Sequence, residues 1–294
     1  MVSTKDSIAV ILPVYNEEHR IRKSIDRLTS YFNGSGWDYQ LIFVDDRSTD
    51  STTSIINEYR RSEKNIQILI PPEHLGKGGS ILYAALTLKS SANYLAYMDS
   101  DLAADPSELE RLFQYIQDFD LVIGSRILRG DLGPITRPIH RSFFSHLYSR
   151  LFRTLFRMPI RDPQCGFKLF KKEVILNLFG EIKTMGFAFD TDMIVTAYSQ
   201  CLTIKEVPIA WAHGKSSKLG LLKEIRKMGI DLFSIWYHCH LLWLEDIISY
   251  PQKKGSVYGR ILFKFLSMSD TIKTRHSGPK FSIPLNMNIV ESST

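Results

Sequence analysis

Two aspartates separated by a single serine, Asp99 and Asp101, are the residues in this sequence whose types and spacing most directly suggest chemistry. They follow the apolar run Tyr94–Met98, which has the length of a buried strand. Two carboxylates at the exit of a strand can share a divalent cation, because Mg²⁺ typically takes one or two carboxylates together with phosphate oxygens of a substrate. A turn capped by an aspartate is the plain structural alternative. Further acidic residues after other predicted strands favour the metal site.

Charged residues also follow the neighbouring apolar runs. Asp45 and Asp46 come directly after one run, and Lys77 stands between two glycines after another. A lysine flanked by glycines is typical of a cation that an unobstructed backbone brings close to phosphate, and an exposed turn lysine shows the same pattern. The sequence has neither Gly-x-Gly-x-x-Gly after its first apolar run nor a Walker loop, which disfavours a Rossmann oxidoreductase and a P-loop enzyme.

These residues must be positioned by an alternation of strands and helices. The apolar runs predicted as strands are Ile8–Val14, Gln40–Val44, Ile66–Ile70, Tyr94–Met98 and Leu121–Gly124. The helical patterns between them cover residues 17–32, 51–61, 78–90 and 106–117. Strands buried on both faces and alternating with helices predict an α/β fold, with a mostly parallel central sheet covered by helices on both faces. In such folds the ligand binds beyond the carboxyl ends of the strands.

Composition sets the remaining bounds. The 294 residues are 44% hydrophobic and 23% charged, which is ordinary globular composition and excludes disorder or coiled coil as a description of the whole chain. The net charge of +6 suits a phosphate-bearing ligand or an anionic surface, and we expect no nucleic-acid partner. Three widely spaced cysteines without a Cys-x-x-Cys pair indicate a reducing compartment and no zinc site. We expect neither a signal peptide nor a membrane-spanning segment.

An ordered set of motifs spans the first 126 residues: Pro13-Val-Tyr-Asn-Glu17, Val44-Asp-Asp-Arg-Ser-Thr-Asp50, Gly76-Lys-Gly78, Asp99-Ser-Asp101 and Gly124-Ser-Arg126. This set resembles the inverting glycosyltransferases of family 2, which have the GT-A fold. Later motifs resemble the dolichyl-phosphate β-glucosyltransferase branch: Asp162-Pro-Gln-Cys-Gly-Phe-Lys-Leu-Phe170, Gly186-Phe-Ala-Phe-Asp190, and Trp211 followed by Ser217-Lys218. We expect the chain to depart from the eukaryotic members of that branch by having no N-terminal membrane anchor. It also has Ala103 where related mannosyl-phosphate synthases carry a further polar metal contact.

The resemblance implies roles at the donor end of the site. Asp99 and Asp101 would hold Mg²⁺ or Mn²⁺, which stabilises the leaving diphosphate as a Lewis acid. The nucleotide sugar would contact a set of six residues, with Asp46 facing the base: Pro13, Tyr15, Glu17, Asp46, Lys77 and Asp99. Asp45 is expected to cap the adjoining turn.

The acceptor decides whether a base is needed. A hydroxyl acceptor must lose a proton, and Asp190 occupies the place where relatives with hydroxyl acceptors keep a carboxylate base. A lipid phosphate is already largely ionised at pH 7, so it needs cations instead. Asp190 would then orient the acceptor or bind sugar hydroxyls, and Asp162 is expected to act likewise.

Cations for a phosphate are plentiful in one segment. Residues 132–161 contain no acidic residue and six arginines, at positions 137, 141, 150, 153, 157 and 161. We predict that Arg126, Arg141 and Lys218 hold the acceptor phosphate, and that at least three of the six arginines only solvate a helix face.

Two amphipathic stripes follow. The first comprises Phe143, Leu147, Leu151 and Leu155, widened by Phe144 and Phe156, and the second comprises Leu221, Ile225, Met228, Leu232, Ile235, Trp236 and Leu242. Core packing and a membrane surface both explain such stripes. The expected organisation is a catalytic domain over residues 6–215, C-terminal helices over 216–266 that lie on a membrane surface, and a flexible tail over 267–294.

The function that follows is transfer of a hexose, with inversion, from a nucleotide sugar to a polyprenyl (dolichyl) phosphate. UDP-glucose or another UDP-hexose is the expected donor, and the product would supply lipid-linked sugar for glycan or protein glycosylation. The expected location is cytoplasmic, peripheral on the cytoplasmic face of a membrane. Two alternatives stay open: a transferase of the same fold with a sugar or protein hydroxyl acceptor, and a non-catalytic protein that binds nucleotide sugars.

Overall fold

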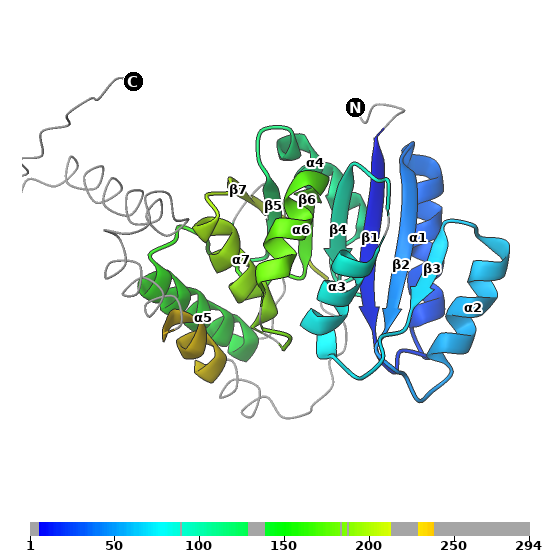
Figure 1. The fold of residues 1–294 in the computed structure, drawn as a ribbon, viewed down its shortest axis with the longest axis horizontal. Coiled ribbons are helices and arrows are strands. Elements are labelled where there is room, and N and C mark those ends of the chain that lie inside the picture. The colour runs from blue at the N-terminus through cyan, green and yellow to red at the C-terminus, as the bar shows by residue number, and fades with distance from the viewer. Residues whose placement is uncertain are drawn as a thin grey trace, which may run out of the picture.

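A seven-stranded sheet runs through the part of the chain that the structure describes, in the order β3-β2-β1-β4-β6-β5-β7 (Figure 1). The computed structural model describes residues 6–88, 90–128, 139–182, 184–186, 188–212 and 229–237, without the side chains of 139–144. The strands are β1 Ser7–Val14, β2 Asp38–Asp45, β3 Ile66–Leu69, β4 Tyr94–Met98, β5 Leu121–Ser125, β6 Phe167–Lys171 and β7 Ile204–Pro208.

Strand direction brings three strand ends to one edge. β1 is parallel to both β2 and β4, and Val14 pairs with Asp45 at the carboxyl ends. β4 ends at Met98 on the same edge, as the sequence predicts. β6 is antiparallel to β4 and β5, while β7 is parallel to β5. The predicted sheet is therefore confirmed as mostly parallel, with β6 as the reversed strand.

Helices cover both faces of this sheet (Figure 1). They are α1 Ile21–Ser35, α2 Thr52–Ser62, α3 Gly76–Thr87, η1 Pro106–Glu108, α4 Leu109–Ile116, α5 Ile139–Phe156, α6 Lys172–Glu181 and α7 Phe189–Ser199. Side chains of β1 alternate between two cores: Ala9 and Ile11 pack with α3, α6 and α7, and Ile8 and Val10 pack with α1 and α4. The alternation explains why the predicted strands read as continuous apolar runs.

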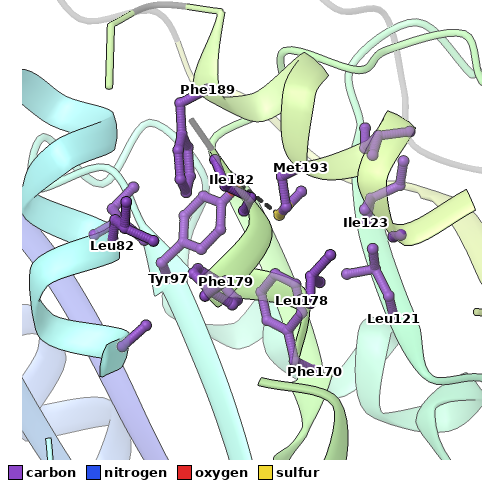
Figure 2. Packing of buried hydrophobic residues seen from close by; sticks show 14 of the residues in the cluster. Leu82, Tyr97, Leu121, Ile123, Phe170, Leu178, Phe179, Ile182, Phe189 and Met193 are labelled. Carbon is purple, nitrogen blue, oxygen red and sulfur yellow. Dashed lines mark hydrogen bonds between the residues drawn. The ribbon is translucent and has the colours of Figure 1, made fainter. Parts of the chain in front are cut away.

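One aromatic cluster fixes α7 against the sheet. Tyr97 of β4 is fully buried and lies between Leu82 of α3 and the α7 residues Phe189 and Met193 (Figure 2). The ring centroids of Tyr97 and Phe170 are 5.8 Å apart in a stacked arrangement. Because Asp190 follows Phe189 in the chain, this packing sets the position of that carboxylate relative to β4.

The first predicted amphipathic stripe is divided between the surface and the core, with Phe156 buried and Leu155 packed against the core. Leu147 and Leu151 of α5 are exposed, whereas Phe152 and Phe156 are buried in the core beside the partly buried Tyr148. Both sets recur at intervals of four, and the larger aromatic side chains bury more apolar area, so they take the inner face.

The predicted C-terminal region is described only in part. Residues 229–237 are helical, and Leu232 and Ile235 from the second predicted stripe are buried in the same core as α5. The remainder of 216–266 and all of the predicted tail, 267–294, lie outside the described residues. Among the described residues, no helix has both the length and the hydropathy that crossing a bilayer requires.

Candidate functional site

The Asp99–Asp101 segment forms a tight turn directly after β4. The amide of Asp99 donates to the carbonyl of Gly166 at 3.2 Å, and the amide of Leu102 donates to the carbonyl of Asp99 at 3.1 Å. A Cβ on Gly166 would lie 2.3 Å from Oδ2 of Asp99, so only glycine allows this close approach. The loop before β6 thus packs directly against one predicted metal ligand.

Asp101 is the more open carboxylate of the pair. It is exposed, and its Oδ1 accepts a hydrogen bond from the Ala103 amide at 3.0 Å. Partial removal from water and then the negative charge of Asp99 raise the pKa of Asp101 above its usual value. A bound cation would relieve this repulsion, and two hard carboxylates suit Mg²⁺ or Mn²⁺. Among the described residues no third His, Cys, Asp or Glu joins them to make a larger metal cluster.

Lys77 lies on the first turn of α3 and faces these carboxylates. Its Nζ is 2.7 Å from Oδ1 of Asp99 and 3.7 Å from Oδ2 of Asp190. Burial acts to lower the pKa of Lys77, but the charges of Asp99 and Asp190 outweigh it and the pKa is raised. A Cβ on Gly78 would lie 2.3 Å from Cβ of Phe189, so the glycine that follows Lys77 lets α3 approach α7. Lys77 is therefore a fixed cation beside the predicted metal ligands.

Asp190 is a buried member of an ion pair. It is 3% exposed, and its Oδ1 accepts hydrogen bonds from Nζ of Lys168 at 2.5 Å and from the hydroxyl of Tyr97. Lys168 is fully buried in β6 and also donates to the carbonyls of Cys165 and, at 3.3 Å, Pro163. These contacts satisfy all three donors of the Lys168 ammonium.

The ion pair determines what Asp190 can do. Burial acts to raise the pKa of Asp190, but the charges of Lys168 and Lys77 outweigh it and the pKa is lowered. A carboxylate that is held ionised by a buried lysine is a weak proton acceptor. The arrangement therefore favours an anchoring role for Asp190 over the role of a base. Lys168 had no role in the sequence-based prediction; the available signal was a lysine inside the apolar run Phe167–Lys171.

Arg126 and Asp162 also neutralise each other. Asp162 is 2% exposed, and its two oxygens accept from Nε and Nη2 of Arg126 in a bidentate pair, both at 2.8 Å. The Arg126 guanidinium lies 5.1 Å from the ring centroid of Trp211. Asp162 therefore orients Arg126, and a phosphate would meet the remaining nitrogen, Nη1. The predicted partners of this arginine, the Arg141 side chain and Lys218, lie outside the described residues.

The predicted base-binding aspartate is engaged by the loop before α3. Asp46 is 3% exposed, and its oxygens accept from the amides of Leu75 and Gly76, each at 2.7 Å. The imidazole of His74 lies 2.9 Å from Oδ2 of Asp46 and 4.8 Å, centroid to centroid, from the ring of Tyr15. A nucleobase would thus meet Tyr15 and His74 before it could share the Asp46 carboxylate. The sequence-based prediction gave His74 no role.

The other residues of this end hold the loops in place. Asp45 accepts from the Ser48 amide at 2.8 Å and from the Thr53 hydroxyl, so its expected capping role is confirmed. Glu17 forms an ion pair with Arg20, with Oε1 2.5 Å from Nη2. Pro13, next to the end of β1, pairs with Val44 of β2. The structure therefore gathers Pro13, Tyr15, Glu17, Asp46, Lys77, Asp99, Asp101, Arg126, Asp162 and Asp190 at the strand ends and their loops.

Residues 9–179 match the model of Glycosyl transferase family 2, which is more than half of the chain, and the protein belongs to this family. A dolichyl-phosphate beta-glucosyltransferase of Drosophila melanogaster is 30% identical and is covered to 74%, with 78% of this chain aligned. The enzyme of the same name from Saccharomyces cerevisiae is 28% identical, with 78% of this chain and 73% of the relative covered.

A solved structure shares the fold. Glucosyl-3-phosphoglycerate synthase from Mycobacterium tuberculosis, crystallised with Mn²⁺ and UDP-glucose, superposes with a TM-score of 0.59, covering 78% of each chain at 18% identity. At this identity the likeness shows the fold alone, and it confirms the predicted α/β architecture. The predicted family is confirmed as well.

Proposed function

We propose that this family 2 enzyme moves a hexose, with inversion, from UDP-glucose or another UDP-hexose to a polyprenyl phosphate such as dolichyl phosphate. The names of the curated relatives support the lipid phosphate acceptor. A structural neighbour that was crystallised with Mn²⁺ and UDP-glucose supports the donor. The single observation that carries the choice of acceptor is the ion pair between Lys168 and Asp190. A hydroxyl acceptor would need Asp190 as a base, and this ion pair makes the carboxylate a weak proton acceptor.

The donor end would stabilise charge on the leaving diphosphate. Mg²⁺ or Mn²⁺ held by Asp99 and Asp101 would supply Lewis-acid chemistry there. Lys77 contributes a second, fixed cation, which Asp99 and Asp190 keep in place. Tyr15 is 47% exposed and provides a ring on which a base can stack.

The acceptor end would supply positive charge and no base. The second ionisation of a phosphate monoester lies near pH 6, so its oxygen attacks without losing a proton at neutral pH. Arg126, oriented by Asp162, presents one guanidinium edge, and Arg141 and Lys218 are proposed to complete the phosphate site. Asp190 keeps Lys168 and Lys77 in position and removes no proton.

One experiment tests the proposal directly. The purified protein is incubated with Mg²⁺ or Mn²⁺, a panel of nucleotide sugars and a short-chain polyprenyl phosphate, and the lipid fraction is analysed by mass spectrometry. A hexosyl phosphate that is labile to mild acid is the expected product. An acid-stable glycoside would instead identify a hydroxyl acceptor, and binding without turnover would leave only a nucleotide-sugar-binding protein.

The cellular setting follows from the acceptor. A polyprenyl phosphate lies in a bilayer, so we place the enzyme peripherally on the cytoplasmic face of a membrane, where it supplies lipid-linked sugar for glycan or protein glycosylation. Fractionation of cells expressing the full chain, with a carbonate wash, tests this location. Release by carbonate is expected of a peripheral protein.

A further inference from the structure

A basic cavity lies beside the Arg126–Asp162 pair and has no part in the site described above. It measures about 400 Å³ and lies between α5 and the segments that flank β5 and β6. Arg150 and Arg153 line it from α5, and Arg161 lines it from the loop before β6. The rest of the lining is formed by Ile127, Leu128, His146 and Ser149.

The three arginines have no acidic partner among the described residues. In the described part of the chain, no acidic side chain forms an ion pair with Arg150, Arg153 or Arg161. The carboxylate of Glu206 lies near this segment, but its oxygens accept hydrogen bonds from the backbone amides of Arg161 and Asp162. The shortest of these bonds, from the Asp162 amide to Oε1, is 2.6 Å. Three guanidinium groups around one cavity repel one another, and an anion between them would remove that repulsion.

The cavity is distinct from the catalytic edge. Its lining includes none of the residues around the predicted metal site, and Arg126, which precedes Ile127 in the chain, pairs with Asp162 and lies over the ring of Trp211. The charge of Arg126 acts to lower the pKa of Lys77, and the charge of Asp99 acts to raise the pKa of Arg126. Arg126 therefore belongs with the residues around the predicted metal site. Of the cavity arginines, Arg150 and Arg153 belong to α5 and Arg161 to the loop before β6.

The chemistry of the lining selects the ligand class. Guanidinium groups match the oxygens of phosphate in paired hydrogen bonds. Ile127 and Leu128 add apolar surface, which suits an ester carrying carbon groups better than a bare ion. On the same helix Leu147 and Leu151 are exposed, and Ile230 and Phe233 of the helix at residues 229–237 are exposed as well. Apolar side chains beside a basic cavity are typical of contact with a phospholipid surface.

We propose that the cavity of Arg150, Arg153 and Arg161 is a binding site for a phosphate ester, separate from the donor and acceptor sites. The head group of an anionic phospholipid is the source that the exposed leucines favour, and a free phosphate compound is the other source. Binding there would orient the protein on a membrane whose lipids carry phosphate groups.

Binding, rather than turnover, provides the test. The probes are inorganic phosphate, measured by titration calorimetry, and vesicles of phosphatidylcholine with and without phosphatidic acid, measured by co-sedimentation. The test variant of the full chain is Arg150→Gln with Arg153→Gln. The matched control is Arg60→Gln with Arg61→Gln, which removes two adjacent exposed arginines from α2. Thermal unfolding followed by circular dichroism checks that both variants fold.

The expected result is a loss of about tenfold or more in affinity for phosphate and for vesicles containing phosphatidic acid, because charge-assisted hydrogen bonds are removed. The control should stay within about twofold, since isolated exposed charges are screened. Loss of phosphate binding alone supports the site with a free phosphate compound as its source. Unchanged binding of both probes, or an equal loss in the control, overturns the proposal.

An activity arm separates this site from the acceptor site. With a short-chain polyprenyl phosphate in neutral detergent, the test variant should keep its acceptor KM within about twofold, because Arg150 and Arg153 lie outside the catalytic edge. A large rise in that KM would assign the cavity to the acceptor and overturn the separate site. The binding arms decide the question even if the chain transfers no sugar to this acceptor.

Discussion

Two acidic regions meet at the same edge of the sheet and are held in opposite ways. Asp101, in the turn after β4, is exposed, and partial removal of its carboxyl group from water, together with the charge of Asp99, raises its pKa. Asp190, at the start of α7, is buried, and the charges of Lys168 and Lys77 hold its pKa below the usual value. Asp99 and Asp101 repel each other at an accessible position, so they can bind a cation. The negative charge of Asp190 is already balanced by lysines, so this carboxylate holds its neighbours in position.

The proposed donor and acceptor ends also differ in where their positive charge would come from. Positive charge at the donor end would come from the cation held by Asp99 and Asp101, and also from Lys77. Positive charge at the proposed acceptor end would come from arginine side chains of the chain itself. This division suits a reaction in which both the leaving group and the attacking group are phosphates.

Replacing Lys168 with methionine should have the largest effect of the changes considered, and the effect should be on the free energy of unfolding. The change removes the closer cation of the buried Asp190 carboxylate and leaves only Lys77, 3.7 Å away. Breaking a buried ion pair costs about 3–5 kcal/mol of unfolding free energy. Urea unfolding followed by circular dichroism measures the loss.

The double variant Lys168→Met with Asp190→Asn serves as its control. It should recover part of the loss, because the remaining buried group is no longer charged. If the single variant is as stable as the parent, the ion pair is not an anchor.

Replacing Asp101 with asparagine should mainly affect turnover. We expect kcat to fall by about 10²–10³-fold, in the range seen when one group that stabilises developing charge is removed. Stability should not fall, because the change removes a repulsion with Asp99. Steady-state kinetics and calorimetric titration with Mn²⁺ measure the two consequences. Unchanged turnover would remove Asp101 from the metal site.

Much of the donor end could be predicted from sequence, because its information is local. Apolar runs of strand length reveal where Val14, Val44 and Met98 end, and parallel strands bring those ends together. The Asp99–Asp101 pair and Lys77 follow such runs directly, so their neighbourhood follows from chain order alone.

The anchoring pair could not be predicted in the same way. Lys168 and Asp190 lie on β6 and α7, and their contact depends on β6 running antiparallel beside β4, which no local pattern encodes. The face that α5 buries could not be predicted either, because Leu147 and Phe152 belong to two stripes of equal spacing.

Replacing Asp190 with asparagine should have a smaller effect on activity than Asp101→Asn. If the acceptor is a phosphate, activity should stay within about tenfold, below the 10²–10⁴-fold that a general base typically contributes. The rate with a polyprenyl phosphate should also not fall between pH 8 and 7. Collapse of activity, with rescue by small carboxylates, would identify a hydroxyl acceptor and contradict the proposed function.

The smallest expected effect separates the two aspartates by the sign of a pH dependence. The pKa of Asp190 is lower in the folded state, so its ionised form stabilises the protein above the unfolded pKa, and that contribution is lost as the pH falls through the folded pKa. The pKa of Asp101 is raised on folding, so its contribution has the opposite sign: the folded state gains relative stability as the pH falls. The measurement is urea unfolding between about pH 3 and 6, a range that spans ordinary carboxyl pKa values. Asp190→Asn should flatten the rise of the unfolding free energy with pH. Asp101→Asn should make that rise steeper. Shifts of the same sign in both variants would mean that the two carboxylates are held alike, and the distinction between an open ligand and a closed anchor would fail.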